Sequence, residues 1–107
     1  MIDTHLSPTL PPFDADGFLQ NPALWTEQIA TTIARLDGIQ DLTNTHFRVI
    51  EYLRDHYLRY GTLPIMRHVC LTLHQSRHCV DELFHTPREA WRIAGLPNPG
   101  EEAKSYM

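Results

Sequence analysis

The residues in this sequence that could take part in the widest range of reactions are its two cysteines, Cys70 and Cys79. A thiolate can carry sulfur, exchange with a disulfide or bind a soft metal. Two cysteines are too few to define a disulfide scaffold, so the simplest interpretation is a pair of small, buried, apolar side chains. A second hypothesis is that one of these thiols accepts sulfur.

Two histidines follow the first cysteine at helical spacing. Cys70, His74 and His78 are four residues apart, and soft sulfur with imidazole could hold zinc or copper. A set of three ligands without a fourth, crossing a predicted helix break at residues 75–76, makes a weak site. We therefore predict no metal and no cofactor, and expect these side chains to form a partly exposed polar face.

The middle of the chain is locally basic, although the whole protein has a net charge of -4. No carboxylate occurs between Asp55 and Asp81. The cationic and titratable residues in that interval are Arg59, Arg67, Arg77, His56, His68, His74 and His78.

Part of this basic stretch is similar to a helix-turn-helix motif. Residues 60–63 form a predicted turn between two helices, and Arg67, His68 and Arg77 lie downstream, where they could contact DNA. Phosphate binding requires several Arg or Lys side chains, and this face offers only two or three. A DNA-binding regulator is therefore an alternative and not the main hypothesis.

Capping residues, prolines and glycines predict an all-α fold, a compact bundle of about five short helices in one domain, 1–107. The signals are Asn21-Pro22 and Asp37-Gly38 around the first helix, Thr43 and Gly61 around the second, Pro64 for the third, residues 76–84 for the fourth, and Thr86-Pro87 and Gly95 around the fifth. Residues 1–20 are predicted to form an irregular arm and residues 98–107 a mobile, exposed tail.

The predicted inner faces of the first three helices follow from apolar spacing. They are Trp25, Ile29, Ile33 and Leu36, then Phe47, Ile50, Leu53 and Tyr57, then Ile65, Val69 and Leu73. No apolar run approaches the ~20 residues of a membrane span, and the N-terminus lacks a signal-peptide pattern. We expect a soluble, cytoplasmic protein without a membrane partner.

Four motifs occur in order: Asp16-Gly17-Phe18-Leu19 with Trp25; Gly38-Ile39 with Leu42-Thr43 and His46-Phe47; Tyr57 to Arg67 with Gly61 and Pro64; and Ile93-Ala94-Gly95-Leu96-Pro97-Asn98-Pro99. Together they resemble the DsrC/TusE family, also called the gamma subunit of dissimilatory sulfite reductase. The resemblance implies a helical fold with a helix-turn-helix-like centre. It also implies that relatives carry sulfur on a cysteine near the end of a flexible C-terminal arm, for sulfite reductase or for tRNA thiolation.

This sequence departs from the family pattern at both cysteine positions. The resemblance places Trp91 at the upstream cysteine and about Glu102 at the cysteine of the arm, and no cysteine follows Cys79. A carrier needs a thiolate on an exposed, mobile segment, and this tail has none. We expect Trp91 to be core or tail-docking surface, and His46 to cap or pack beside Thr43 rather than to act as a base.

We therefore predict a non-enzymatic accessory or regulatory partner of sulfur-relay or sulfite reductase proteins. The residues predicted to dock the partner are Arg67, Gly95, Leu96 and Pro97. Two alternatives stay open. One is an active sulfur carrier that uses Cys70 or Cys79, and the other is the DNA-binding regulator described above.

Overall fold

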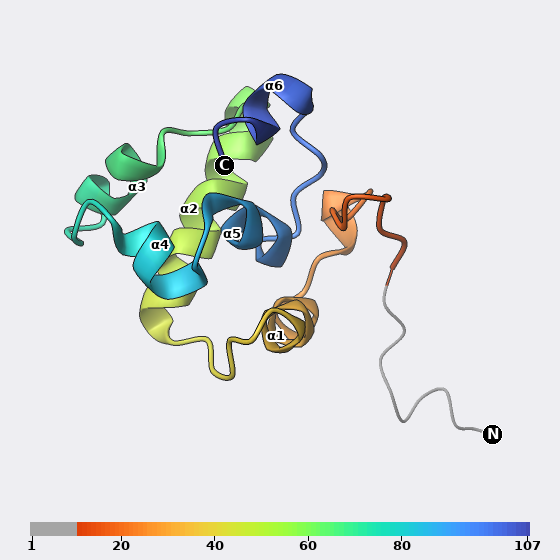
Figure 1. The fold of residues 1–107 in the computed structure, drawn as a ribbon, viewed down its shortest axis with the longest axis horizontal. Coiled ribbons are helices and arrows are strands. Elements are labelled where there is room, and N and C mark those ends of the chain that lie inside the picture. The colour runs from red at the N-terminus through yellow and green to blue at the C-terminus, as the bar shows by residue number, and fades with distance from the viewer. Residues whose placement is uncertain (1–10) are drawn as a thin grey trace.

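The computed structural model describes residues 11–107, so the first half of the predicted N-terminal arm, residues 1–10, lies outside the described part (Figure 1). The predicted helical fold is confirmed. The elements are η2 (Pro22–Leu24), α1 (Glu27–Leu36), α2 (Asn44–Tyr60), α3 (Met66–Thr72), α4 (Cys79–Phe84), α5 (Pro87–Ile93) and α6 (Glu101–Lys104). Within residues 11–107, the only strand-like pairing is a single bridge between Phe13 and Leu19. No helix of that range is long and apolar enough to cross a bilayer.

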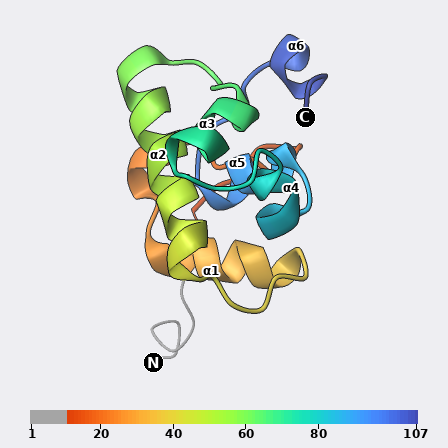
Figure 2. The same cartoon turned by 90° about the vertical axis from the view of Figure 1, so that its left-hand side faces the viewer.

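Helix α5 lies at the centre of the fold, because it packs against α1, α2 and α4. Its inner face is fully buried and consists of Ala90, Trp91 and Ile93. The long helix α2 runs along one side of the molecule and packs against α3, α4 and α5 (Figure 2). Helix α6 stands at the opposite end of the molecule from α1 in both views (Figures 1 and 2).

Threonine side chains cap α5 and two of the helices that pack against it, α1 and α2. Thr26, Thr43 and Thr86 each accept a hydrogen bond from a backbone N–H in the first turn of α1, α2 and α5. The caps at Thr43 and Thr86 confirm the predictions, but the predicted start of the first helix is wrong. Asn21 caps only the 3-10 turn η2, and the chain is extended at Trp25 before Thr26 begins α1.

Two residues predicted to face the core lie at the surface instead. Leu36 is 74% exposed because it is the last residue of α1, and Ile65 is 59% exposed. Ile65 has an extended backbone and precedes α3, so the inner face of α3 consists of Val69 and Cys70. The predicted fourth helix is also shorter than expected, because α4 begins only at Cys79.

A disulfide between Cys70 and Cys79 joins α3 to α4. The expectation of burial is confirmed, since the two residues are 0% and 2% exposed, but the expectation of free thiols is wrong. His74, at a φ of +59°, turns the chain back after α3 and brings the two Cα atoms to 5.7 Å. Helix periodicity cannot reveal this return, because it depends on one residue in a left-handed conformation.

Reduction of the disulfide should destabilise the protein. Loop-closure entropy for cysteines nine residues apart predicts a loss of about 2–3 kcal/mol. In a chain of this size that loss corresponds to a drop in Tm of at least about 10 °C. Thermal unfolding followed by circular dichroism, with and without a phosphine reductant, measures it. The Cys70→Ala/Cys79→Ala variant should show no response to reductant, and an unchanged wild-type Tm would contradict the prediction.

Candidate functional site

Residues Gly95, Leu96 and Pro97, here called the neck, connect α5 to the tail at residues 98–107. Gly95 has a φ of +70°, and a β-carbon at this position would overlap the indole ring of Trp25. Leu96 is fully buried. Gly95 and Leu96 are thus buried in this fold, and their predicted docking role stays a prediction. They fix the direction in which the chain leaves α5.

Side chains from distant segments bind the free carbonyls at the end of α5. Trp25 Nε1 donates to the carbonyl of Ile93 at 2.9 Å, and Arg54 Nη1 donates to that of Ala94 at 2.9 Å. The last carbonyls of a helix lack partners within it, so these bonds satisfy groups that would otherwise need water. Arg54 also lies over the Trp25 ring, 4.5 Å from its centroid. Burial lowers the pKa of the Arg54 guanidinium, which still remains charged at neutral pH.

Trp91, on α5, holds the other end of the neck. Its ring is fully buried and meets the ring of Tyr57 edge-on at 5.8 Å. Its Nε1 donates to the carbonyl of Pro97 at 2.7 Å. The ring is therefore both core and neck support, in agreement with the sequence-based expectation. The indole ring of Trp91 fills this part of the interior, and an indole cannot carry or exchange sulfur.

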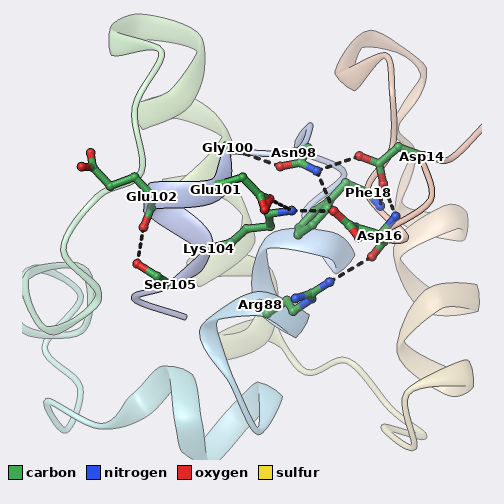
Figure 3. Close-up of polar contacts among 10 residues, drawn as sticks. All are labelled: Asp14, Asp16, Phe18, Arg88, Asn98, Gly100, Glu101, Glu102, Lys104 and Ser105. Carbon is green, nitrogen blue, oxygen red and sulfur yellow. Dashed lines mark hydrogen bonds and ion pairs between the residues drawn. The ribbon is translucent and has the colours of Figure 1, made fainter.

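The tail is attached to the turn that precedes η2 (Figure 3). Lys104 Nζ lies 2.5 Å from Asp16 Oδ2 and 2.6 Å from Glu101 Oε2. Asn98 Nδ2 donates to Asp14 Oδ2 and to Asp16 Oδ2, both at 3.1 Å. The hydrogen bond and the charge of Lys104 hold the pKa of Asp16 below its usual value. In return, the hydrogen bond to Asp16, and after it the hydrogen bond to Glu101, raises the pKa of Lys104. We call these contacts the tail latch.

Glu102 lies on α6 and is exposed. Its side chain points away from the tail latch (Figure 3). The segment predicted as a mobile, exposed tail thus contains a short helix held by the latch, and its mobility stays a prediction. The correspondence of Trp91 and Glu102 to the family's cysteine positions stays a prediction.

The basic residues from α3 and the following loop are partly brought together. Arg67, Arg77 and His78 line one surface cavity of about 350 Å³, which Asp81 also lines. His68 is exposed but does not line this cavity. Contact with DNA at these residues, and a helix-turn-helix role for α2 and α3, stay predictions.

The proposed metal-ligand set is not assembled. Cys70 is bonded to Cys79, and α3 ends at Thr72, before His74 and His78. Within residues 11–107, no three His, Cys, Asp or Glu side chains are close enough to hold a metal ion.

His46 is structural, as expected. Its Nδ1 accepts a hydrogen bond from the backbone N–H of Thr43 at 3.0 Å, which completes a capping box. Its Nε2 lies 2.9 Å from the carbonyl of Leu83, so the ring also joins α2 to α4. Sequence spacing suggested the cap, but the link to Leu83 spans 37 residues and has no sequence signal.

Comparison with known proteins gives a consistent family. The profile of the family described as "DsrC like protein" matches residues 9–101. The "Sulfurtransferase TusE homolog" of Haemophilus influenzae is 33% identical, over 82% of this chain and 88% of the relative. The "Sulfurtransferase TusE" of Sodalis glossinidius is 36% identical, over 80% of this chain and 87% of the relative.

Solved structures show the same likeness. The oxidised gamma subunit of the dissimilatory sulfite reductase from Archaeoglobus fulgidus matches with a TM-score of 0.73 and 34% identity, over 85% of this chain and 90% of that one. The DsrC/gamma subunit of Pyrobaculum aerophilum matches with a TM-score of 0.70 and 35% identity, over 83% of each chain. A helical bundle similar to the DsrC structures is thus the class of fold. This chain belongs to the DsrC-like family, which includes TusE.

Substitution of Gly95 should be far more harmful than substitution of a glycine in open space. Gly95→Ala should lower the free energy of unfolding by about 2–4 kcal/mol, because it combines a positive φ with overlap on Trp25. Gly61→Ala is the matched control, since Gly61 has a φ of +68° and no neighbour within 4 Å of an added β-carbon. It should cost about 1–2 kcal/mol. Urea unfolding compares them, and equal losses would refute the steric role of the neck.

The tail latch should open at both extremes of pH. Because the pKa of Asp16 is lowered in the folded state, the Asp16 carboxylate stabilises the latch fully above the ordinary pKa of 3.8. This stabilisation is lost as the pH falls through the lower, folded-state pKa. Because the pKa of Lys104 is raised in the folded state, its ammonium group stabilises the latch fully below the ordinary pKa of 10.5. This stabilisation is lost as the pH rises through the higher, folded-state pKa. Amide chemical shifts of residues 101–104 report both transitions.

The Lys104→Met variant should show neither transition and should give tail shifts like those of the opened latch at neutral pH. Glu101→Gln is the control, since it leaves the contact between Lys104 and Asp16 in place. Because Asp16 is partly exposed, added salt should weaken the latch. Tail shifts that are insensitive to Lys104→Met would contradict an electrostatic latch.

Proposed function

We propose that this protein is a non-enzymatic accessory or regulatory partner of sulfur-relay or sulfite reductase proteins that carries no sulfur itself. One observation carries the proposal. Both cysteines of the chain are buried in one disulfide. The family resemblance adds the expectation that Trp91 and Glu102 stand where carriers have thiols.

The chemistry of sulfur transfer supports this view. A persulfide forms when an exposed thiolate attacks a sulfur donor, and it moves on when a partner thiolate reaches it. The sulfur atoms of Cys70 and Cys79 meet neither condition, since both residues are at most 2% exposed. Disulfides are rare in reducing compartments, but burial restricts attack by thiol reductants.

The parts of the scaffold that a partner could touch are retained. Arg67 is exposed on α3, Pro97 is partly exposed, and the latched tail presents Glu102 to solvent. The neck keeps this tail at a fixed exit from α5. A protein of this kind would occupy the docking sites of carriers and thereby regulate, or scaffold, sulfur delivery.

A second candidate function is a sulfur carrier that works in the reduced state. It is favoured by the names of the relatives, which are sulfurtransferases, and by the proximity of the cysteines, whose Cα atoms lie 5.7 Å apart. After reduction, one thiol could accept sulfur and the other could release it by attack on the persulfide. This route requires α3 and α4 to open, because both thiols lie in the core.

Intact-mass analysis after treatment with sodium tetrasulfide separates the two functions. The wild-type protein is treated as purified, and again after reduction and removal of the reductant. The accessory role predicts no added sulfur in the native protein in either state. The variant Glu102→Cys is the positive control, because it places an exposed thiol at the family position and should gain sulfur.

A stable gain of sulfur by the reduced wild-type protein would overturn the accessory role. Loss of that gain in Cys70→Ala and in Cys79→Ala, tested separately, would identify the carrying thiol. Circular dichroism of each reduced sample excludes modification of unfolded protein.

A further inference from the structure

Two surface hollows adjoin along α3 and the start of α5, because Met66 and Pro87 line both of them. The first is the basic cavity of about 350 Å³ described above. The second has about 380 Å³ and a mainly apolar lining. Its other lining residues are Leu63, Pro64, Ile65 and Tyr106. We call the two hollows together the α3 groove.

The disulfide holds the basic end of the groove together. Arg67 precedes Cys70 by three residues on α3, and Arg77 and His78 directly precede Cys79. The bond between the two cysteines therefore fixes α3 and the loop before α4 relative to each other. The two arginines are ten residues apart in the sequence, yet they line one cavity.

The charges of this end are not neutralised by ion pairs. Arg59 pairs with Asp55 and Arg92 with Asp37, but Arg67 and Arg77 form no ion pair with any residue of 11–107. Asp81 is the one carboxylate among the residues that line the basic cavity. Two arginines against one aspartate leave a positive cavity on a protein whose net charge is -4.

The other end of the groove exposes apolar side chains. Ile65 is 59% exposed and Tyr106 is 79% exposed, and Leu63 and Pro64 line the same hollow. A ligand that buried them would gain the free energy of removing apolar surface from water. The groove therefore matches a ligand with a carboxylate at one end and an apolar side chain at the other.

We propose that the α3 groove binds an extended, acidic segment of a partner protein, with a carboxylate between Arg67 and Arg77 and a neighbouring apolar side chain against Ile65 and Tyr106. Arginine suits this role because its guanidinium binds a carboxylate through two parallel hydrogen bonds. Nucleic acid is a poorer match, since an apolar half and Asp81 both disfavour a chain of phosphates. The inference rests on the docking role proposed above and names the chemistry of the docked segment.

The test is a ¹⁵N NMR titration of the full chain with the blocked peptide acetyl-Glu-Glu-Leu-Phe-amide, which detects even weak binding. Amides of residues 63–67, 77–81 and 106 should shift together. The double variant Arg67→Gln/Arg77→Gln should weaken binding by about tenfold, because it removes two exposed ion pairs with the peptide. Asp81→Asn should tighten binding, because it removes the opposing carboxylate. Arg35→Gln is the matched control, an exposed arginine on α1 outside the groove, and should change nothing.

The proposal is overturned if these amides do not shift, or if the neutral peptide acetyl-Gln-Gln-Leu-Phe-amide binds equally well. It is also overturned if inorganic phosphate or a DNA duplex produces the same shifts more strongly, or if the shifts appear on concentrating the protein alone, which would indicate self-association. Sulfur loading is measured separately by mass. Peptide binding by a chain that accepts sulfur would therefore refute the accessory role and leave the groove intact.

Discussion

The constraint on which this structure depends is the satisfaction of the carbonyl groups around the end of α5. Trp25, Arg54 and Trp91 supply three N–H donors from three parts of the chain, to the carbonyls of Ile93, Ala94 and Pro97. A buried carbonyl without a partner costs about 1–3 kcal/mol, so these bonds hold the N-terminal segment, α2 and the neck to the central helix. Gly95 permits the close approach of Trp25 that makes the arrangement possible.

The position of the tail follows from the neck. Because the chain leaves α5 in a fixed direction, Asn98 and Lys104 reach Asp14 and Asp16 in the turn before η2 (Figure 3). The residue that supports the neck is Trp91, whose indole N–H donates to the carbonyl of Pro97. Packing, hydrogen bonds and charge therefore hold both the neck and the tail.

Much of the fold could be predicted from local signals, because Thr43, Gly61 and Thr86 act through their own helix ends. The burial of both cysteines followed from their side-chain chemistry. Their pairing did not, since it depends on the turn at His74. The long-range contacts of the neck and the latch join residues 40 to 88 positions apart, and no periodicity reports such distances. The basic residues were identified from composition, but only the fold shows that Arg67 and Arg77 share a cavity and His68 does not.

The central claim is that the folded protein has no thiol available for sulfur. Trapping of thiols in intact cells with an alkylating reagent, followed by isolation and mass analysis, tests it most directly. The account predicts no alkylation of Cys70 or Cys79 in the native protein, none after unfolding without reductant, and alkylation of both after unfolding with reductant. Alkylation of either cysteine in the native protein within the cell would contradict the account, because it would reveal an accessible thiol where the structure has a buried bond.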